Sequence, residues 1–288
     1  MRALLLFLLS AWATLASCVP PPNNYDYEVQ DWRARCITNN SSVDGASYVA
    51  TTTFMQQLKW WNLRRFINRA NIYLGADTNA LMCPLIRNFV FTDAISSQSD
   101  TLVAFVATNY SATGAKCNGT TQYINTGLAA NGFSSASDIH LATYSRTSIY
   151  EVGGAIGSAD SVGYVNYFLF GWIDSNCYMY FGGTGDQTSA ADPTPPTGFY
   201  LGTRTSTTSR VIYKNGVSIN SSGATVGGSI NGNVIFVHGL NSNNALNSPT
   251  HRELCFYGVG IGVPATYQGN YYKAVQRLQL TRNRAIIP

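Results

Sequence analysis

Charged residues are scarce in this chain of 288 residues. Lysine and arginine number 18, aspartate and glutamate number 14, and the two groups together make up 11% of the sequence. An ordinary soluble domain has about 25%. The formal net charge of +4 is small, and the basic residues are dispersed instead of forming the stripe that nucleic-acid binding requires. We therefore predict no nucleic-acid partner.

Long hydrophobic runs are also lacking, since no apolar stretch reaches the ~18 to 20 residues that span a bilayer. The longest stretch lies in residues 1–18, where Arg2 precedes an apolar run and small residues precede Cys18. This layout predicts a secretory signal peptide. Residues 15–18 read Leu-Ala-Ser-Cys, which resembles the lipobox of bacterial lipoproteins, whose cysteine is acylated. Ordinary signal-peptidase cleavage nearby is the alternative.

We therefore expect an exported protein. With Cys18 lipidated, it is a lipoprotein of the outer membrane or cell surface that contacts the membrane only through its lipid anchor. Without lipidation, it is extracellular or at a virion surface. Residues 19–53 are polar, begin with three prolines near position 20 and show no sustained periodicity, so they are interpreted as a linker or tether.

The six cysteines contain no C-x-x-C pair, which argues against a zinc site. Once Cys18 is lipidated or removed, five remain: Cys36, Cys83, Cys117, Cys177 and Cys255. An exported protein permits disulfides, so these five form at most two pairs with one thiol left over, or they are simply buried.

Residues 54–91 are predicted to be a helical lead-in. Phe54, Leu58 and Trp61 recur at helical spacing, which predicts a helix over residues 54–74. A second, short helix is expected to begin at Asp77. At the other end of the chain, the apolar positions of residues 270–284 predict a closing amphipathic helix.

From about residue 92 the pattern changes to short β-like runs separated by turn residues, which is typical of an all-β sandwich. The expected strands are residues 102–107, 139–144, 163–172, 177–181, 198–204, 209–213, 217–219, 233–238 and 254–262. Between two of these runs, Asn215-Gly216 supplies two residues that accept a positive φ. We therefore expect a hairpin over residues 210–219.

Several short segments occur in an order that resembles LamG-like domains, the concanavalin A-like jelly-roll domains of bacterial exported proteins and phage structural proteins. These segments are residues 61–66, 80–81, 118–127, 142–147, 157–160, 199–204, 213–216 and 271–279. The resemblance implies a mainly β fold: a two-sheet antiparallel jelly-roll sandwich with short N-terminal helices and a C-terminal helix. The jelly-roll domain itself is expected over residues 92–288. One departure is that residues 262–269, before the last helix, contain no acidic residue.

The first and last strands of such sandwiches tend to be neighbours. The resemblance therefore implies that Cys117 and Cys255 lie close together, which would let them pair as a disulfide.

Jelly-roll folds also host retaining glycanases, which need two carboxylates about 5 to 5.5 Å apart. The related glucanases carry them on one strand as Glu-x-Asp-x-Glu, whereas this chain has only Glu28, Glu151 and Glu253. There is no Gly-x-Ser-x-Gly motif, and the histidines at 140, 238 and 251 lie on or beside expected strands. We therefore predict that the chain is not an enzyme, with a divergent glycan hydrolase as the less favoured alternative.

An aromatic run on two expected strands is the candidate ligand site. Aromatic rings stack on sugar faces, while neighbouring polar groups bind the hydroxyls. The candidate ligand-binding residues are Trp172, Asp174, Tyr178, Tyr180 and Arg204. The loops offer oxygen ligands for calcium at Asp160 and Asp174, although neither matches a complete calcium loop. Burial of the same aromatics in a core is the alternative.

Together these features predict a non-enzymatic surface protein whose jelly-roll domain binds a carbohydrate or another surface protein. The alternative is a structural or assembly subunit of a virion or surface filament, which self-associates through its tyrosine-rich faces.

Overall fold

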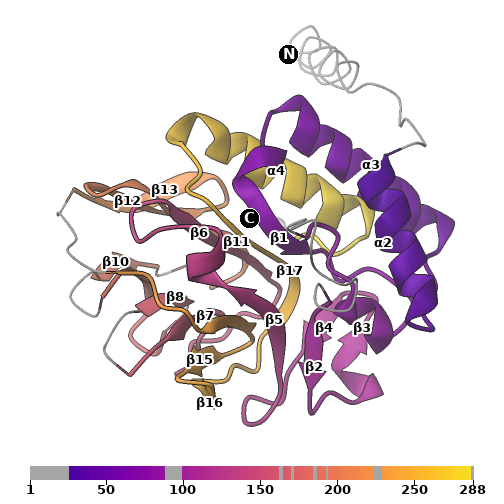
Figure 1. Cartoon of the computed structure of the whole chain (residues 1–288), viewed down its shortest axis with the longest axis horizontal. Helices are drawn as coiled ribbons and strands as arrows, with labels where there is room; N and C mark the ends of the chain where they lie inside the picture. Colours follow the sequence, from indigo (N-terminus) through magenta and orange to yellow (C-terminus); the bar gives the residue numbers. More distant parts are fainter. Residues whose placement is uncertain are drawn as a thin grey trace, which may run out of the picture.

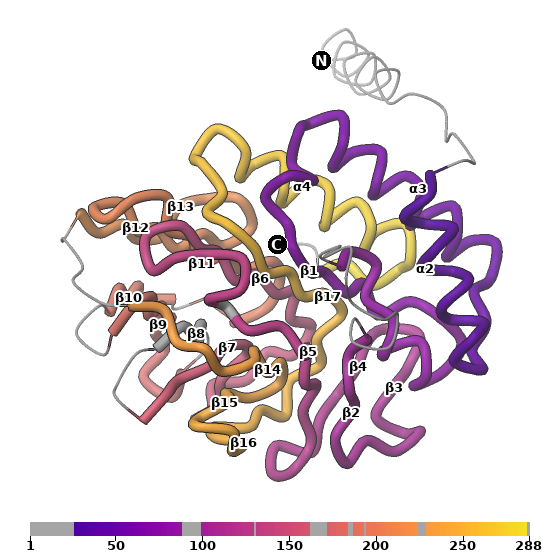
Figure 2. The backbone as a smooth tube through the Cα atoms, in the orientation of Figure 1, coloured from indigo at the N-terminus to yellow at the C-terminus, as the bar shows by residue number. Residues whose placement is uncertain are grey.

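The computed structural model describes residues 26–87, 99–161, 165–169, 172–183, 187–192, 194–223 and 229–286. Within these ranges the protein is mainly β, with three α-helices and two large sheets whose strands pair antiparallel apart from one short parallel contact. Figures 1 and 2 show the helices gathered on one side of the molecule and the strands on the other. No helix in these ranges is long and apolar enough to cross a membrane.

The first sheet, sheet A, has the strand order β13-β12-β11-β6-β17-β4-β3, and β1 pairs with β17 beside β4. Its strands are β1 (Ile67–Asn71), β3 (Tyr110–Ser111), β4 (Gly114–Lys116), β6 (Ile139–Ser145), β11 (Gly198–Ser206), β12 (Ser209–Lys214), β13 (Val217–Ser222) and β17 (Glu253–Gly260). Because β1 and β4 share one edge of β17, segments from both halves of the chain meet on the same strand.

The second sheet, sheet B, has the order β10-β9-β8-β7-β14-β5-β2, and the short strand β15 pairs with both β16 and β7. Its strands are β2 (Thr101–Val103), β5 (Tyr123–Ala129), β7 (Ile156–Ala159), β8 (Val165–Leu169), β9 (Asn176–Phe181), β10 (Gln187–Ala191), β14 (Val234–Val237), β15 (Leu240–Ser242) and β16 (Ala245–Asn247).

The two sheets face each other across a shared hydrophobic core, which gives a sandwich-like arrangement. Leu141, Tyr257 and Val259 enter this core from sheet A, and Ile156 and Met179 enter it from sheet B. Side chains on a strand alternate between the two faces of the sheet. The intervening residues of sheet A therefore point to its other face.

That other face is covered by α2 (Tyr27–Thr38), α3 (Gly45–Trp60) and α4 (Ala265–Thr281). Tyr144 and Phe256 of the sheet pack there against Phe54 of α3 and Tyr271 of α4. The molecule thus has three layers: helices, sheet A and sheet B.

The interpretation of residues 19–53 as a linker is wrong for the described part, residues 26–53. Asp26 and Asp44 cap α2 and α3 by accepting hydrogen bonds from the backbone N–H groups of Glu28 and Ser47. Both helices bury residues, among them Trp32, which is 0% exposed. Apolar side chains are few in this segment, so its helical period is weak in the sequence.

The predicted helix over residues 54–74 is also placed wrongly. The helix α3 begins nine residues earlier and ends at Trp60, and residues 67–71 form β1 instead. Pairing of β1 with β17 satisfies the backbone groups of this segment, and that long-range contact outweighs the local helical spacing. The short helix expected at Asp77 is present as a 3-10 helix over Thr78–Met82, capped by Asp77.

Several predicted elements are confirmed. The strands β6, β9, β11, β12, β14 and β17 match their predictions to within two residues at each end. The β12–β13 hairpin turns at Asn215 and Gly216, whose φ angles are 50° and 78°. The closing helix is present but begins five residues earlier than predicted, directly after Pro264. Strands β3, β4, β5, β7, β10, β15 and β16 were not predicted.

The predicted disulfide between Cys117 and Cys255 is wrong, because all five described cysteines are free and buried. The neighbouring strands are as expected, since Leu254 pairs with Ala115. However, Ala115 and Leu254 face the core between the sheets, whereas Cys255 faces the helices. The two cysteines are therefore not partners across the strand pair. Cys18, the predicted lipidation site, lies outside the described residues.

The packing of the helical layer predicts that two tryptophans contribute very differently to stability. Replacing the buried Trp32 by alanine leaves a cavity and is expected to lower the free energy of unfolding by about 3–5 kcal/mol. Trp60 is 65% exposed, and Trp60→Ala is the matched control, with a change within about 0.5 kcal/mol. Urea denaturation followed by circular dichroism measures both. Equal effects of the two substitutions would contradict the packing of α2 on the core.

Candidate functional site

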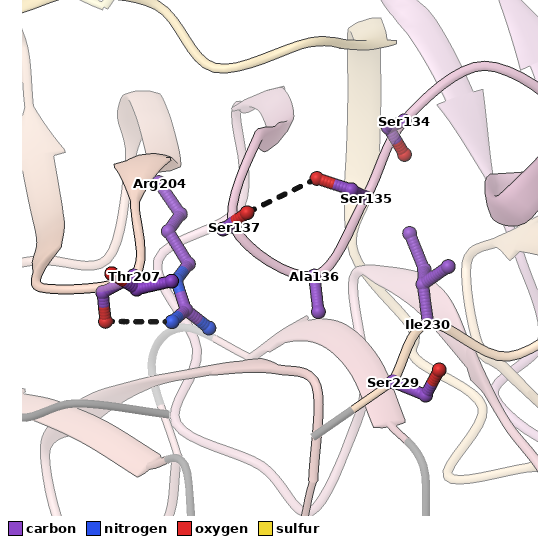
Figure 3. A pocket seen from close by; sticks show the side chains of 8 residues that line it. All are labelled: Ser134, Ser135, Ala136, Ser137, Arg204, Thr207, Ser229 and Ile230. Atoms are coloured by element: carbon purple, nitrogen blue, oxygen red, sulfur yellow. Dashed lines mark hydrogen bonds between the residues drawn. The ribbon is translucent and has the colours of Figure 1, made fainter. Parts of the chain in front are cut away.

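A small pocket opens between three loops that are far apart in the sequence. It is formed by the segment before β6, the turn after β11 and the segment before β14, and its volume is about 300 Å³. The lining residues, shown in Figure 3, are Ser134, Ser135, Ala136, Ser137, Arg204, Thr207, Ser229 and Ile230. This volume is at the low end for ligand pockets, and it suits one small ring or a terminal sugar.

Arg204 at the end of β11 supplies the charge in this pocket. Its guanidinium donates to three backbone carbonyls: Nη1 to Phe181 at 2.8 Å, Nη2 to Thr207 at 2.9 Å and Nε to Ser206 at 3.0 Å. These contacts tie the end of β9 to the β11–β12 turn. Arg204 is only 1% exposed, so it lies beneath the pocket surface and acts on a ligand mainly through its charge.

Hydroxyl groups form most of the pocket rim. Ser134, Ser135 and Ser137 come from one loop, and the Oγ atoms of Ser135 and Ser137 lie 3.2 Å apart (Figure 3). Thr207 and Ser229 come from the other two loops. A hydroxyl both donates and accepts hydrogen bonds, so this rim suits a ligand that carries hydroxyl groups of its own. The single charge among the eight lining residues is the positive charge of Arg204.

The other sequence-predicted ligand residues lie on β9 or just before it, with Trp172 and Asp174 preceding the strand and Tyr178 and Tyr180 on it. Tyr178 donates a hydrogen bond to the carboxylate of Asp174, and its ring packs edge-on against Trp172 with centroids 6.4 Å apart. Tyr178 and Tyr180 are half-exposed, whereas Met179 and Phe181 are buried between the sheets. We call Trp172, Asp174, Tyr178 and Tyr180 the tyrosine patch.

The structure therefore divides the five predicted ligand residues into two groups. Four of them form the tyrosine patch on the outer face of sheet B, and Arg204 lies under the pocket, where it donates to the carbonyl of Phe181. The hydrogen bond from Tyr178 lowers the pKa of Asp174 below its usual value, with a smaller contribution from Asn176. The patch thus presents an ionised carboxylate beside two half-exposed rings.

The two candidate calcium ligands are not brought together. Asp160 follows β7, whereas Asp174 precedes β9 and accepts its hydrogen bonds from Tyr178 and from the backbone N–H of Asn176. Among the residues described by the structure, no three His, Cys, Asp or Glu side chains gather where they would hold a metal ion.

The three glutamates are each held by cations in different parts of the fold. Glu28 on α2 contacts Lys59 and Arg64. Glu151 receives a hydrogen bond from Thr250, and its carboxylate lies 3.4 Å from Nε of the buried Arg252.

Glu253 accepts a hydrogen bond from Thr113 and lies 3.8 Å from Arg146. Within the described ranges, the side-chain contacts of the three glutamates are thus to cations, hydroxyls and N–H groups, and none is to a second carboxylate.

Sequence reasoning missed a buried polar cluster around Asp192, just after β10. Asp192 is 3% exposed and accepts hydrogen bonds from Tyr200 at 2.5 Å, Lys214 at 2.7 Å and Thr194 at 2.9 Å. Burial, followed by the charges of Cys177 and Asp192, raises the pKa of Tyr200. Tyr200 and Lys214 are register partners on neighbouring strands, a pairing that could be found in the sequence only after the hairpin was aligned with β11.

Two of the three histidines are core residues, and the third is exposed. Burial lowers the pKa of His140 to about 4 and that of His238 to about 3. His140 lies 2.6 Å from the carbonyl of Ile261, and the ring of His238 stacks on that of Tyr73. The third, His251, is exposed and places Nδ1 3.0 Å from Glu151.

Comparison with known proteins gives structural similarity without sequence similarity. No family model matches the chain, and no curated protein matches it. A mutant of Trypanosoma rangeli sialidase with trans-sialidase activity is similar with a TM-score of 0.49 and 8% identity, over 81% of this chain and 40% of that one. NanB sialidase of Streptococcus pneumoniae gives a TM-score of 0.37 and 8% identity over 46% and 23%.

A carbohydrate-binding module is also among the similar structures. The CBM40 of the Ruminococcus gnavus IT-sialidase, bound to α2,3-sialyllactose, is similar with a TM-score of 0.37 and 8% identity, over 47% of this chain and 81% of that one. The chain thus spans less than half the length of the sialidases that it matches. At such low identity these likenesses concern the fold alone.

The prediction that the chain is not an enzyme is not supported. The chain was predicted to be a non-enzymatic surface protein because it lacks a Glu-x-Asp-x-Glu strand, yet the similar structures include sialidases, which are enzymes. A missing motif of one enzyme family says nothing of catalytic groups that come from separate strands. The exclusion of enzymes was therefore wrong, and neither the non-enzymatic protein nor the virion or filament subunit is retained.

The buried histidines predict that stability falls in mild acid. The unfolded chain binds protons at these imidazoles below about pH 6.5, whereas the folded chain does not do so until pH 4 to 3. The free energy of unfolding is therefore expected to fall between pH 6.5 and pH 5 by on the order of 1.4 kcal/mol per pH unit for each histidine. Urea denaturation at several pH values measures this slope.

His140→Gln removes one of the two buried imidazoles. It is expected to reduce the slope by the contribution of one histidine, on the order of 1.4 kcal/mol per pH unit. The matched control is Leu141→Ala at the neighbouring buried position, which lowers stability at every pH without changing the slope. A slope unchanged by His140→Gln would contradict a neutral, buried His140.

Proposed function

We propose that this protein binds a glycan through an acidic sugar that occupies the pocket over Arg204. The single observation that carries the proposal is the composition of the pocket, in which five hydroxyl side chains surround one arginine. Sugar hydroxyls are matched by the hydroxyls of Ser134, Ser135, Ser137, Thr207 and Ser229. The acidic group of the sugar, a carboxylate or a sulfate, is matched by the guanidinium.

The burial of Arg204 strengthens the preference for an acidic ligand. A charge under a surface of low dielectric is screened less than one in water, so its field extends into the pocket. Because the guanidinium is fixed by carbonyls of Phe181, Ser206 and Thr207, it need not reorganise when the ligand enters. A neutral sugar of the same size gains the hydroxyl contacts but not this attraction.

The tyrosine patch is proposed as a contact for further units of a longer glycan. Its support is the half-exposed ring of Tyr178, held by Asp174 and Trp172 on the outer face of sheet B. Aromatic rings with a polar neighbour suit the apolar face and the hydroxyls of a sugar.

The finer points of fold and location belong to the same proposal. Two features support a jelly-roll sandwich of the concanavalin A type: the hydrophobic core between the two sheets and the antiparallel strand order within each sheet. The apolar run and the Leu-Ala-Ser-Cys sequence at residues 15–18 support export, with a lipid on Cys18 as the anchor. A glycan-binding protein at a cell surface is consistent with both.

The pocket predicts how replacing each of two alanines by phenylalanine affects sugar affinity. Ala136 lines the pocket, and Ala136→Phe fills it, so affinity for an acidic sugar is expected to fall at least tenfold while the melting temperature is kept. Ala245→Phe on the exposed strand β16 is the matched control and leaves affinity unchanged. Titration calorimetry with glucuronate, N-acetylneuraminate, glucose and galactose measures binding.

Acidic sugars are expected to bind more tightly than the neutral ones, and the difference shrinks as salt is raised. Equal binding of glucose and glucuronate, or binding that Ala136→Phe leaves intact, would overturn the proposal. Loss of binding in Tyr178→Ala alone would move the ligand to the tyrosine patch. The same sugars, supplied as 4-nitrophenyl glycosides, measure cleavage alongside binding.

A further inference from the structure

Two cysteines far apart in the sequence lie together in the helical layer. Cys36 is in the last turns of α2, and Cys83 directly follows the 3-10 helix of Thr78–Met82. They are 47 positions apart, yet both are 0% exposed and belong to the same hydrophobic cluster. Neither residue takes part in the pocket or the tyrosine patch.

The geometry of α2 places Cys36 against Cys83. Residues three and four positions apart lie on the same face of a helix, so Trp32 and Asn39 flank Cys36 on its face of α2. Both neighbours contact Cys83: the indole Nε1 of Trp32 donates to its carbonyl at 3.1 Å, and Nδ2 of Asn39 lies 3.1 Å from its Sγ. Cys36 lies between Trp32 and Asn39 on this face, so its side chain points toward Cys83.

Each thiol affects the titration of the other. The neighbouring Cys36 lowers the pKa of Cys83, and the neighbouring Cys83 raises the pKa of Cys36. The amide of Asn39 and the nearby charge of Arg35 lower the pKa of Cys83 further. Since the thiolate is the nucleophile in disulfide exchange, Cys83 is the sulfur that reacts first.

The geometry points to a redox-dependent disulfide between Cys36 and Cys83 that closes when the protein meets a low-molecular-weight disulfide as oxidant. Both thiols are buried, so the oxidant reaches them when this segment opens locally. The Cys83 thiolate then attacks one sulfur of the oxidant, forms a mixed disulfide and releases one thiol. Cys36 then loses its proton and attacks the Cys83 sulfur, which releases the second thiol. Two protein thiols are oxidised and one small disulfide is reduced to two thiols, so atoms and electrons balance.

The other described cysteines have different surroundings. Cys177 donates to Asp192 in the core between the sheets, and Cys255 donates to the carbonyl of Tyr144 under the helices. Cys117 lies beside β4 on another strand pair. The closed disulfide would join α2, the first described helix, to the segment that leads from β1, and it would restrict the unfolded chain over the loop between residues 36 and 83.

Peptide mapping of the full chain tests the inference. Trypsin cuts after Arg35, Lys59, Arg69 and Arg87, so Cys36 falls in residues 36–59 and Cys83 in residues 70–87. After the folded protein is equilibrated with oxidised glutathione and its remaining thiols are blocked, we expect these two peptides as one linked species. Adding dithiothreitol before blocking is expected to separate them.

Two variants make the test specific. Cys117→Ser is the control and keeps the linked species, whereas Cys36→Ser abolishes it. Closure is also expected to raise the melting temperature of the wild type by on the order of 5 to 10 °C, and the Cys36→Ser protein shows no such rise. Recovery of both peptides unlinked and blocked from oxidised, folded wild type would overturn the inference, as would linkage of either peptide to a different cysteine.

Discussion

Burial of sheet A on both faces is the constraint on which the rest of the structure depends. Along β17, Leu254 and Tyr257 face the core between the sheets, while Cys255 and Phe256 face the helices. Strand β6 is buried at all seven of its residues. Such a sheet is stable only when apolar partners cover both sides, so sheet B and the helical layer are both required, and α2 and α3 are integral parts of the fold.

The scarcity of charge in the sequence has a counterpart inside the fold. Three arginines are at most 1% exposed: Arg204, Arg252 and Arg284. Backbone carbonyls accept from each of them, namely Phe181, Ile149 and Tyr73 respectively, at 2.7 to 2.9 Å. A buried charge is costly unless it is hydrogen-bonded, and these contacts offset that cost while they fix loops in place. At Arg204 the same contacts leave the charge beside the pocket.

The position of the pocket over Arg204 follows from where the strands of sheets A and B end in loops. The loop before β6 and the turn after β11 leave neighbouring strands of sheet A, whereas Phe181 and the segment before β14 belong to sheet B. The pocket therefore lies where loops of both sheets meet, and Arg204 bridges them through its bond to Phe181. The tyrosine patch depends instead on strand alternation along β9, which places Tyr178 and Tyr180 on the outer face and Met179 and Phe181 in the core.

The sequence by itself determined the features whose signal is local. Short β-like runs between turn residues marked β6, β9 and β17, and the Asn215-Gly216 pair marked a hairpin, because only such residues accept two positive φ angles cheaply. Tertiary structure alone decided the rest. It made residues 67–71 a strand, gathered the pocket from three distant loops and placed Cys36 against Cys83. A local pattern does not predict contacts between residues tens of positions apart, because those contacts form only when the layers pack.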